Sequence, residues 1–149
     1  MKKVNINDIK EQAWQSPGGK YAVSFKGISE ALGREPDSLD LSERHPFDLE
    51  WNRVPAGKQN FPYHAHSAQW ELYLVISGQG RVRHKDGTTD VLAGDAFIFG
   101  PDELHQLINS GRTASTDQLR PGRPHLLRGC GQPHRRIGLL SRQREVEGQ

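Results

Sequence analysis

The chain lacks several features that define a protein class at once. Its 149 residues include a single cysteine, Cys130, which excludes an internal disulfide framework and favours a reducing compartment. No apolar run approaches the roughly 20 residues that a membrane span needs. The polar residues after Met1-Lys2-Lys3 do not form the apolar core of a signal peptide. We therefore expect a cytoplasmic protein with no membrane partner.

Aromatic residues and lysine are absent from the C-terminal segment, residues 111–149. Only 9 of its 39 residues are hydrophobic, and it is rich in Arg, Gly, Pro and Gln. This composition predicts a poorly ordered tail. A shifted reading frame in GC-rich DNA would produce the same composition, a hypothesis that sequencing the gene around codons 109–115 tests.

Charge is unevenly distributed along the chain. Residues 1–110 carry 12 Lys or Arg against 15 Asp or Glu, whereas residues 111–149 carry 8 Arg against 3 acidic residues. Overall basicity therefore belongs to the tail and says little about the rest of the chain. The tail has no aromatic residue to stack on bases, and no helix-turn-helix pattern is visible, so a nucleic-acid partner is disfavoured.

Short strands and turns dominate the remainder. Pro46–Val54 alternates apolar and polar residues, as a half-buried strand does, and the continuous apolar run Leu72–Ile76 predicts a strand covered on both faces. The Asp86-Gly87 pair predicts a hairpin. Further strands are predicted at Tyr21–Phe25, Ala96–Phe99, Leu104–Asn109 and, as a short strand, near Val4–Ile6, with a short helix at Ser29–Leu32. This spacing indicates an all-β sandwich or barrel.

One domain in three parts follows from these patterns. Residues 1–44 form an N-terminal arm and loop, residues 45–110 form the barrel core, and residues 111–149 form the tail.

Two histidines and a glutamate stand just before the apolar run. Residues two apart in a strand point to one face, so His64 and His66 would direct their imidazoles to one point. Glu71 follows after a turn-like step, and a closed sheet could bring His105 alongside. Three nitrogens and a carboxylate oxygen suit one divalent transition metal ion, with Fe, Mn, Zn, Ni and Cu all compatible. A His-X-His pair alone is common on protein surfaces; the spacing of Glu71 and His105 is what favours a site.

The glycines and candidate ligands form two motifs. Gly57-X6-His64-X-His66-X4-Glu71-X6-Gly78 resembles the first motif of the cupin superfamily, with one additional residue between Gly57 and His64. Gly94-X5-Gly100-X-Asp102-X2-His105-X3-Asn109 resembles the second. The fifteen residues Gln79–Ala93 separate them, similar to the spacing of small bacterial cupins. The stretch Phe61–Gly80 also resembles single-domain cupins described as sugar-phosphate-isomerase-like.

The resemblance implies an antiparallel jelly-roll β-barrel, usually dimeric, with His64, His66, Glu71 and His105 as metal ligands. The superfamily includes isomerases, dioxygenases, decarboxylases, lyases, storage proteins and sugar sensors, so the fold does not fix the function. One hypothesis is a metal-dependent enzyme that acts on a sugar, sugar phosphate or carboxylate by isomerase-, lyase- or dioxygenase-type chemistry. The other is a non-catalytic metal- or ligand-binding protein, either a sensor or an inactive member. Both predict a small-molecule ligand and a homodimer.

The chain departs from the second cupin motif at two positions. Gly100 and Asp102 stand where proline and glycine are usual. Aspartate tolerates the left-handed conformation that such a turn requires, whereas Gly100 is expected to loosen the turn. A larger departure follows Gly111, where cupins continue with an apolar strand that closes the barrel and none is apparent here.

Other residues near the motifs have two readings each. Tyr63, Tyr73 and His84 are candidate general bases, and none is assigned. Tyr63, Tyr73, Phe97 and Phe99 would line a ligand cavity or, more commonly, form core. Arg81, Arg83 and His84 would bind an anionic substrate or, as we favour, form a solvated hairpin face.

Strand alternation assigns the remaining side chains to faces. Counting from Glu71 places Tyr73 and Val75 inward and the row Trp70, Leu72 and Leu74 outward. Gln106 should point away from the metal. Asn109 shares the face of His105 and could donate a hydrogen bond to a ligand.

Overall fold

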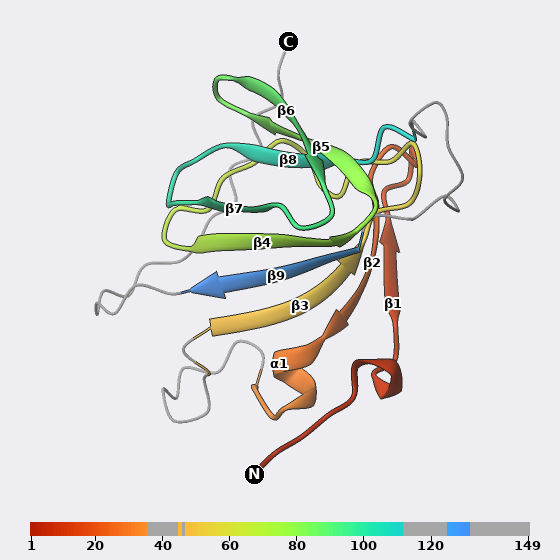
Figure 1. Ribbon diagram of the computed structural model, residues 1–149, viewed down its shortest axis with the longest axis vertical. Coiled ribbons are helices and arrows are strands. Elements are labelled where there is room, and N and C mark those ends of the chain that lie inside the picture. The colour runs from red at the N-terminus through yellow and green to blue at the C-terminus, as the bar shows by residue number, and fades with distance from the viewer. Residues whose placement is uncertain (36–44, 46, 112–124, 132–149) are drawn as a thin grey trace.

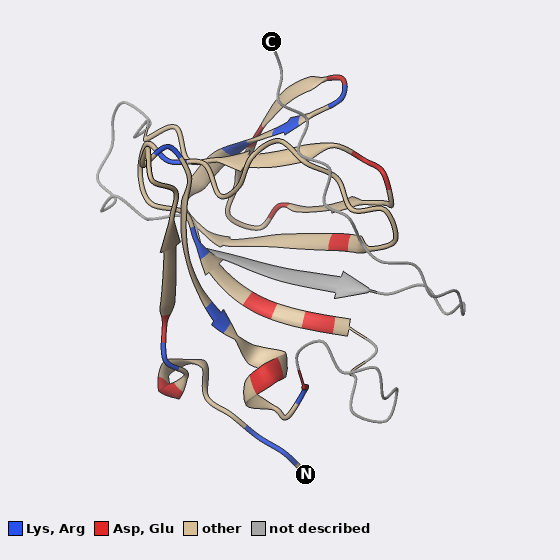
Figure 2. Cartoon of the chain, turned by 180° about the vertical axis from the view of Figure 1, so that it is seen from behind, with Lys and Arg blue, Asp and Glu red and all other residues tan. Residues whose placement is uncertain are grey.

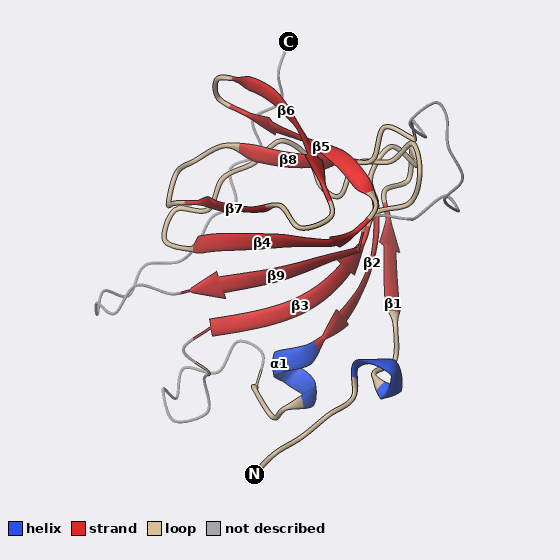
Figure 3. Cartoon of the chain, in the orientation of Figure 1, coloured by secondary structure: helices blue, strands red, loops and turns tan. Residues whose placement is uncertain are grey.

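The computed structural model describes residues 1–35, 45, 47–111 and 125–131 (Figure 1). Strands make up almost all of the regular structure, and the short helices lie in the N-terminal part (Figure 3). In chain order the elements are η1 (Ile6–Asp8), β1 (Gln12–Gln15), β2 (Ala22–Gly27), α1 (Ile28–Ala31), β3 (Phe47–Arg53), β4 (Trp70–Ser77), β5 (Gln79–His84), β6 (Gly87–Leu92), β7 (Ala96–Phe99), β8 (His105–Ile108) and β9 (His125–Gly131). None of these helices has the length and apolarity that a membrane span requires.

The strands form two antiparallel sheets. The larger sheet has the order β1-β2-β3-β9-β4-β7, and the smaller has the order β6-β5-β8. Every ladder is antiparallel, as predicted for a jelly roll. Within the described residues the ladders make two sheets rather than one continuous ring. The smaller sheet lies across β4 and β7 in Figure 1.

The core lies between the two sheets. Val54, Tyr73, Val75 and Leu107 form a buried cluster, with Val91, Phe97 and Phe99 packed against it. The cluster draws on β4 and β7 from the larger sheet and on β6 and β8 from the smaller. Burial of these side chains is what joins the sheets, because hydrophobic burial contributes about 25 cal/mol per Å² of apolar surface.

Strand β4 alternates between buried and exposed residues. Glu71, Tyr73 and Val75 are buried, whereas Trp70, Leu72, Leu74 and Ile76 are 39–50% exposed. The inward and outward assignments are therefore confirmed, but the prediction that both faces of this strand are covered is wrong for the single chain. The continuous apolar run hides the alternation, because the outward face carries apolar residues too.

Strand β9 corrects the expectation that no strand closes the fold after Asn109. Its backbone pairs with β3 from Phe47↔Gly131 to Arg53↔His125, and with β4 from Trp70↔Gly131 to Ser77↔His125. The strand was missed because His125–Gly131 contains two glycines and an arginine around the short apolar pair Leu126-Leu127. The central position of β9 in the sheet, between β3 and β4, therefore outweighs the weak strand propensity of its own sequence.

The N-terminal arm contributes two strands to the larger sheet. The predicted strands at Tyr21–Phe25 and Pro46–Val54 are confirmed by β2 and β3, and the predicted helix by α1. The strand predicted near Val4–Ile6 is wrong, because this segment enters the helix η1, which the Asn5 side chain caps by accepting from the Asn7 N–H at 2.9 Å. Arm, core and tail all supply strands to one sheet, and the division at residues 44 and 110 stays a prediction.

Candidate metal centre

Four side chains predicted as ligands meet at one point between the sheets. His64, His66, Glu71 and His105 each offer one ligand atom, and these atoms all lie within 4.8 Å of one another. Glu71 comes from β4 in the larger sheet and His105 from β8 in the smaller, while the two other histidines come from the loop before β4. The cluster therefore depends on both sheets.

The loop that carries His64 and His66 is held against β8. Backbone N–H groups of Asn60 and His64 donate to the carbonyls of Leu107 (3.0 Å) and His105 (3.2 Å), and the His105 N–H returns to the His64 carbonyl (2.8 Å). The segment is an isolated bridge at His64 and not a regular strand, so the strand geometry expected for His64 and His66 is wrong. Pairing with β8 nevertheless turns both imidazoles to the same side.

His64 is prepared as a neutral ligand. Its Nδ1 lies 2.7 Å from the Pro62 carbonyl oxygen, which can only accept, so Nδ1 carries the proton and Nε2 keeps its lone pair. The pKa of His64 is lowered from 6.5 to about 4, mainly by burial and also by the neighbouring His105 and His66, against the smaller raising effects of the Pro62 carbonyl and Glu71. The imidazole is therefore unprotonated at neutral pH, as a metal ligand must be.

His105 shows the same arrangement. Its Nδ1 lies 2.9 Å from the Glu103 carbonyl oxygen, so Nε2 of the neutral ring has only a lone pair to present. That Nε2 lies 2.8 Å from Oε2 of Glu71, and both side chains are 1% exposed. Two lone pairs at this distance repel, so the pair requires a proton or a nearby cation. The donor set itself thus fits a cation.

His66 completes the cluster on its open side. Its Nε2 lies 3.0 Å from Oε1 of Glu71, yet it is buried and has no hydrogen-bond partner. A buried nitrogen without a partner is costly, and a bound cation would satisfy it. The His66 side chain is 22% exposed, against 1% for Glu71, so the cluster is more exposed on the His66 side than on the Glu71 side.

Aromatic rings form the wall behind the ligands. Phe99 stacks on the imidazole of His105 with ring centroids 4.4 Å apart and an angle of 9°. Phe61 meets His64 edge-on at 6.1 Å. Phe97 stacks on Tyr73 further into the core and does not contact a ligand ring. The contacts of Phe99 and Phe61 restrict the planes of the two ligand rings.

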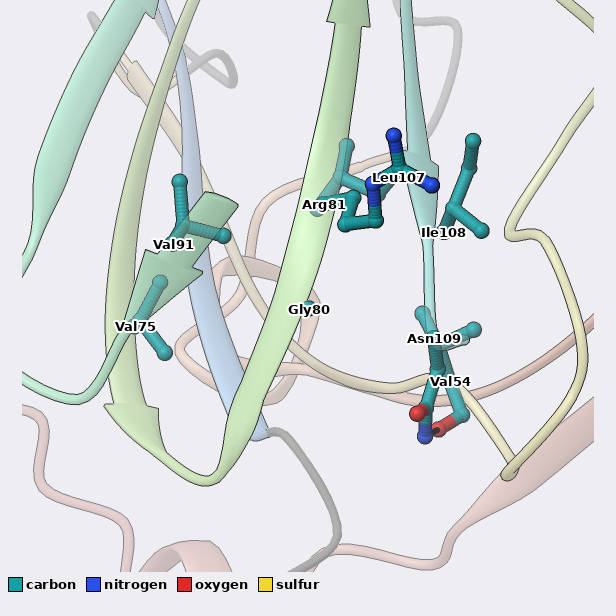
Figure 4. Close-up of a pocket in the computed structure, with 8 residues that line it drawn as sticks. All are labelled: Val54, Val75, Gly80, Arg81, Val91, Leu107, Ile108 and Asn109. Carbon is teal, nitrogen blue, oxygen red and sulfur yellow. Dashed lines mark hydrogen bonds between the residues drawn. The ribbon is translucent and has the colours of Figure 1, made fainter. Parts of the chain in front are cut away.

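A separate, small pocket lies between the sheets. Its lining consists of Val54, Val75, Gly80, Arg81, Val91, Leu107, Ile108 and Asn109 (Figure 4). It contains none of the four ligand residues. The side chains of Tyr73 and Leu107 occupy the intervening positions on β4 and β8, so this cavity is separate from the metal cluster.

Several candidates from the sequence lie away from the cluster. Asn109 is buried, but its amide donates to the Val54 carbonyl at 3.0 Å and accepts from the Gly111 N–H, so it does not support a ligand and that expectation is wrong. Gln106 points away from the metal as predicted and donates to Gln59 and to the Phe61 carbonyl.

The basic hairpin also lies outside the cluster. Arg81 pairs with Asp90 at 3.4 Å, the Arg83 guanidinium stacks 4.2 Å from the Tyr63 ring, and His84 contacts the Thr89 hydroxyl at 2.9 Å. Blue segments on the β5–β6 hairpin mark its Lys and Arg residues in Figure 2. The favoured reading, a solvated hairpin face, agrees with this geometry.

The turn before His105 is firmer than expected. Asp102 has φ 63°, the left-handed geometry predicted for it, and its N–H donates to the His66 carbonyl at 2.8 Å. The Gly100 N–H donates to the Glu103 carboxylate at 2.6 Å, and a Cβ on Gly100 would lie 3.4 Å from the Trp70 ring. The prediction that Gly100 loosens the turn overlooked these two contacts.

Sequence reasoning missed the polar residues that hold the ligand loop. Asn60 is 6% exposed, and its side-chain oxygen accepts from the Leu107 N–H at 3.0 Å. The Pro62 and Glu103 carbonyls fix the two histidine tautomers. No motif spacing reveals such contacts; the only signal is that each carbonyl lies two residues before a ligand histidine.

A two-sheet antiparallel fold around three histidines and one glutamate defines a class, the β-proteins with a candidate metal centre between their sheets. Residues 50–116 match the sequence model of the Cupin domain family, and solved cupins share the fold. The family match identifies residues 50–116 as a Cupin domain, and the fold agrees with it. Sequence comparison with curated proteins gives no match.

Three solved structures illustrate the likeness. A sugar phosphate isomerase from a cupin superfamily, from Silicibacter pomeroyi, has TM-score 0.62 and 19% identity, covering 89% of this chain and 82% of that one. A protein named as a predicted oxalate decarboxylase, from Thermotoga maritima, has TM-score 0.65 and 18% identity, covering 88% and 99%. A cupin 2 conserved barrel domain protein from Rhodopseudomonas palustris has TM-score 0.58 and 16% identity, covering 87% and 75%. Identities this low show a shared fold alone.

Proposed function

We propose that this cupin binds one divalent transition metal ion through His64, His66, Glu71 and His105 and acts there on a small oxygenated molecule. The observation that carries the proposal is the convergence of the four ligand atoms within 4.8 Å. Such a donor set suits Fe, Mn, Zn, Ni or Cu, and four protein ligands on a six-coordinate ion leave two positions open. When bound, the ion would supply Lewis-acid or redox chemistry.

The protein's own residues would orient and shield this site. The Pro62 and Glu103 carbonyls hold Nδ1–H of His64 and His105, so that both Nε2 atoms face the centre. Phe99 restricts rotation of the His105 ring and closes the inner side. A substrate would approach past His66, the more exposed side of the cluster.

Sugars, sugar phosphates and small carboxylates are the substrate classes that we propose, with isomerase-, lyase- or dioxygenase-type chemistry. Oxygen atoms of such molecules are suitable ligands for the open positions of these ions. The names of two similar structures, a sugar phosphate isomerase and a predicted oxalate decarboxylase, fall in the same range. Cytoplasmic location and homodimer formation remain part of the proposal.

One observation favours the alternative, a non-catalytic metal- or ligand-binding cupin. The Tyr73 hydroxyl donates to Glu71, Arg83 stacks on the Tyr63 ring, and His84 bonds Thr89 on the exposed hairpin. Two of the three candidate bases, Tyr73 and His84, are therefore engaged in hydrogen bonds and are not placed to act as a general base. A sensor or an inactive member needs no such base.

Metal analysis combined with turnover assays separates the two functions. The purified protein would be loaded with Fe(II), Mn(II) or Zn(II) and assayed for oxygen uptake and for isomerisation or cleavage of sugars, sugar phosphates and small carboxylates. Turnover that His64→Ala abolishes, and that the exposed control Asp90→Asn leaves unchanged, supports the enzyme. Tight binding of one of these compounds without turnover supports the sensor. A protein that retains no divalent metal contradicts both.

A further inference from the structure

A tyrosine hydroxyl contacts the carboxylate at the centre of the cluster. Tyr73 is 2% exposed, and its OH donates to Oε2 of Glu71 at 2.6 Å. The two residues are two apart on β4 and so share its inward face. An OH donor to a carboxylate at this distance is a strong, charge-assisted hydrogen bond.

The tyrosine ring is itself held in place from several sides. Phe97 stacks on it with centroids 5.2 Å apart and an angle of 19°, and Phe99 meets it edge-on at 6.3 Å. The His105 imidazole lies 6.2 Å away, at 63°. Such packing leaves the hydroxyl little freedom, so the hydrogen bond constrains the carboxylate more than it constrains the tyrosine.

The two oxygens of Glu71 consequently differ. Oε2 accepts from Tyr73 and faces His105 at 2.8 Å, whereas Oε1 faces the partnerless Nε2 of His66 at 3.0 Å. A donor that occupies Oε2 holds the carboxylate plane, with Oε1 directed toward His66, on the side from which a substrate would approach.

We propose that Tyr73 is a positioning residue, which holds Glu71 as a single-oxygen ligand with Oε1 toward the metal. This inference rests on the proposed metal-binding function. It assigns Tyr73 a task other than that of a general base, because its hydroxyl is engaged with a ligand. A carboxylate that uses one oxygen also occupies one position on the ion instead of two, which preserves an open position for a small molecule.

Tyr73→Phe tests the proposal, because it keeps the aromatic ring and removes only the hydroxyl. Metal-free parent and variant would be titrated with Co2+ in competition with a chromophoric chelator, and the visible spectrum of bound Co2+ would be recorded. We expect affinity to fall about 10- to 100-fold, the range for loss of a hydrogen-bond partner of a metal ligand, with an altered Co2+ spectrum. Equal affinity and an unchanged spectrum would overturn the proposal.

Phe97→Leu is the matched control, since it disturbs the same aromatic stack without touching Glu71. It should lower the melting temperature of the metal-free protein and leave the affinity and spectrum of Co2+ unchanged. If Phe97→Leu weakens Co2+ binding as much as Tyr73→Phe does, packing and not the hydroxyl is responsible, and the proposal fails.

A second measurement does not depend on how well the variant folds. In a crystal structure of the Co2+-loaded parent, Oε1 of Glu71 should contact the ion and Oε2 should accept from Tyr73. Both oxygens on the ion would overturn the inference while the metal-binding function stands. A parent that binds no Co2+ in the titration would overturn the proposed function and this inference with it.

Discussion

His64 and His105 exchange backbone hydrogen bonds across the site: the His64 N–H donates to the His105 carbonyl at 3.2 Å, and the His105 N–H donates to the His64 carbonyl at 2.8 Å. Directly opposed residues of an antiparallel pair point to the same face. Their imidazole centroids accordingly lie 4.7 Å apart. This one pair joins the two sequence motifs, because His64 belongs to the first motif and His105 to the second.

Asn60→Ala should weaken this junction. The Asn60 side-chain oxygen accepts from the buried Leu107 N–H, and its loss leaves that donor without a partner at a cost of about 1–3 kcal/mol. We expect a lower melting temperature and weaker metal binding, because the loop that carries His64 loosens. Asn5→Ala removes a comparable but exposed side-chain bond to Asn7 and is the control. Equal effects of the two substitutions would count against a special role for Asn60.

Acidification should destabilise the metal-free protein through His64. Its pKa is lowered to about 4 in the folded state from 6.5, so between these values the unfolded chain binds more protons. The stabilising contribution is present above pH 6.5 and is lost as the pH falls through about 4. Urea unfolding at several pH values measures this dependence. In His64→Gln the slope should be smaller; a slope equal to that of the parent would refute the assignment.

Gly80→Ala should destabilise the smaller sheet. A Cβ on Gly80 would lie 2.9 Å from the backbone carbonyl oxygen of Ile108, which cannot move without disturbing the pairing of β5 with β8. Overpacking of this kind costs about 1–3 kcal/mol. Gly18→Ala is the control, since nothing lies within 4 Å of its added Cβ. Thermal unfolding of the two variants should differ clearly, and similar melting temperatures would contradict the close approach seen at Gly80.

The outer face of the larger sheet is where we propose that a second copy of this chain binds. Leu72 of β4 is 50% exposed and is paired with Ile98 of β7, which is 54% exposed. On its other side Leu72 is paired with Gly129 of β9, which is in turn paired with Leu49 of β3. An apolar row with side chains from three strands, β3, β4 and β7, suits a two-fold contact, in which the same surface meets itself.

Light scattering coupled to size-exclusion chromatography tests the dimer. The parent should elute with twice the mass of one chain, and Leu72→Glu should shift it to a monomer. Thr88→Glu, an exposed residue of β6 in the smaller sheet, should leave the mass unchanged. A monomeric parent, or a Leu72→Glu variant that remains dimeric, would show that this face is not the contact.

Much of the fold followed from the sequence because its signals are local. Asp86-Gly87 specified the hairpin, and alternation from Glu71 assigned the inward side chains of β4. Strand β9 could not be predicted, because its place is set by pairing with β3 and β4 and not by its own composition. The burial predicted for the outer face of β4 was too high, because a continuous apolar run in the sequence does not distinguish a buried strand face from an exposed one.

The candidate site divides in the same way. Motif spacing brought His64, His66, Glu71 and His105 together, but it could not show that the Pro62 and Glu103 carbonyls select the histidine tautomers. Asn109 was assigned to the cluster by alternation alone. In the structure the Asn109 side-chain amide instead donates to the Val54 carbonyl. This backbone carbonyl is buried next to the end of β3 and needs a hydrogen-bond donor.

The central claim is that these four side chains hold a single metal ion, and native mass spectrometry with elemental analysis tests it most directly. The parent should carry one divalent transition metal ion per chain. Glu71→Gln, which keeps the shape of the side chain and removes its charge, should lose the ion, while the exposed control Asp90→Asn should keep it. A parent without metal, or a Glu71→Gln variant with undiminished metal content, would contradict the account.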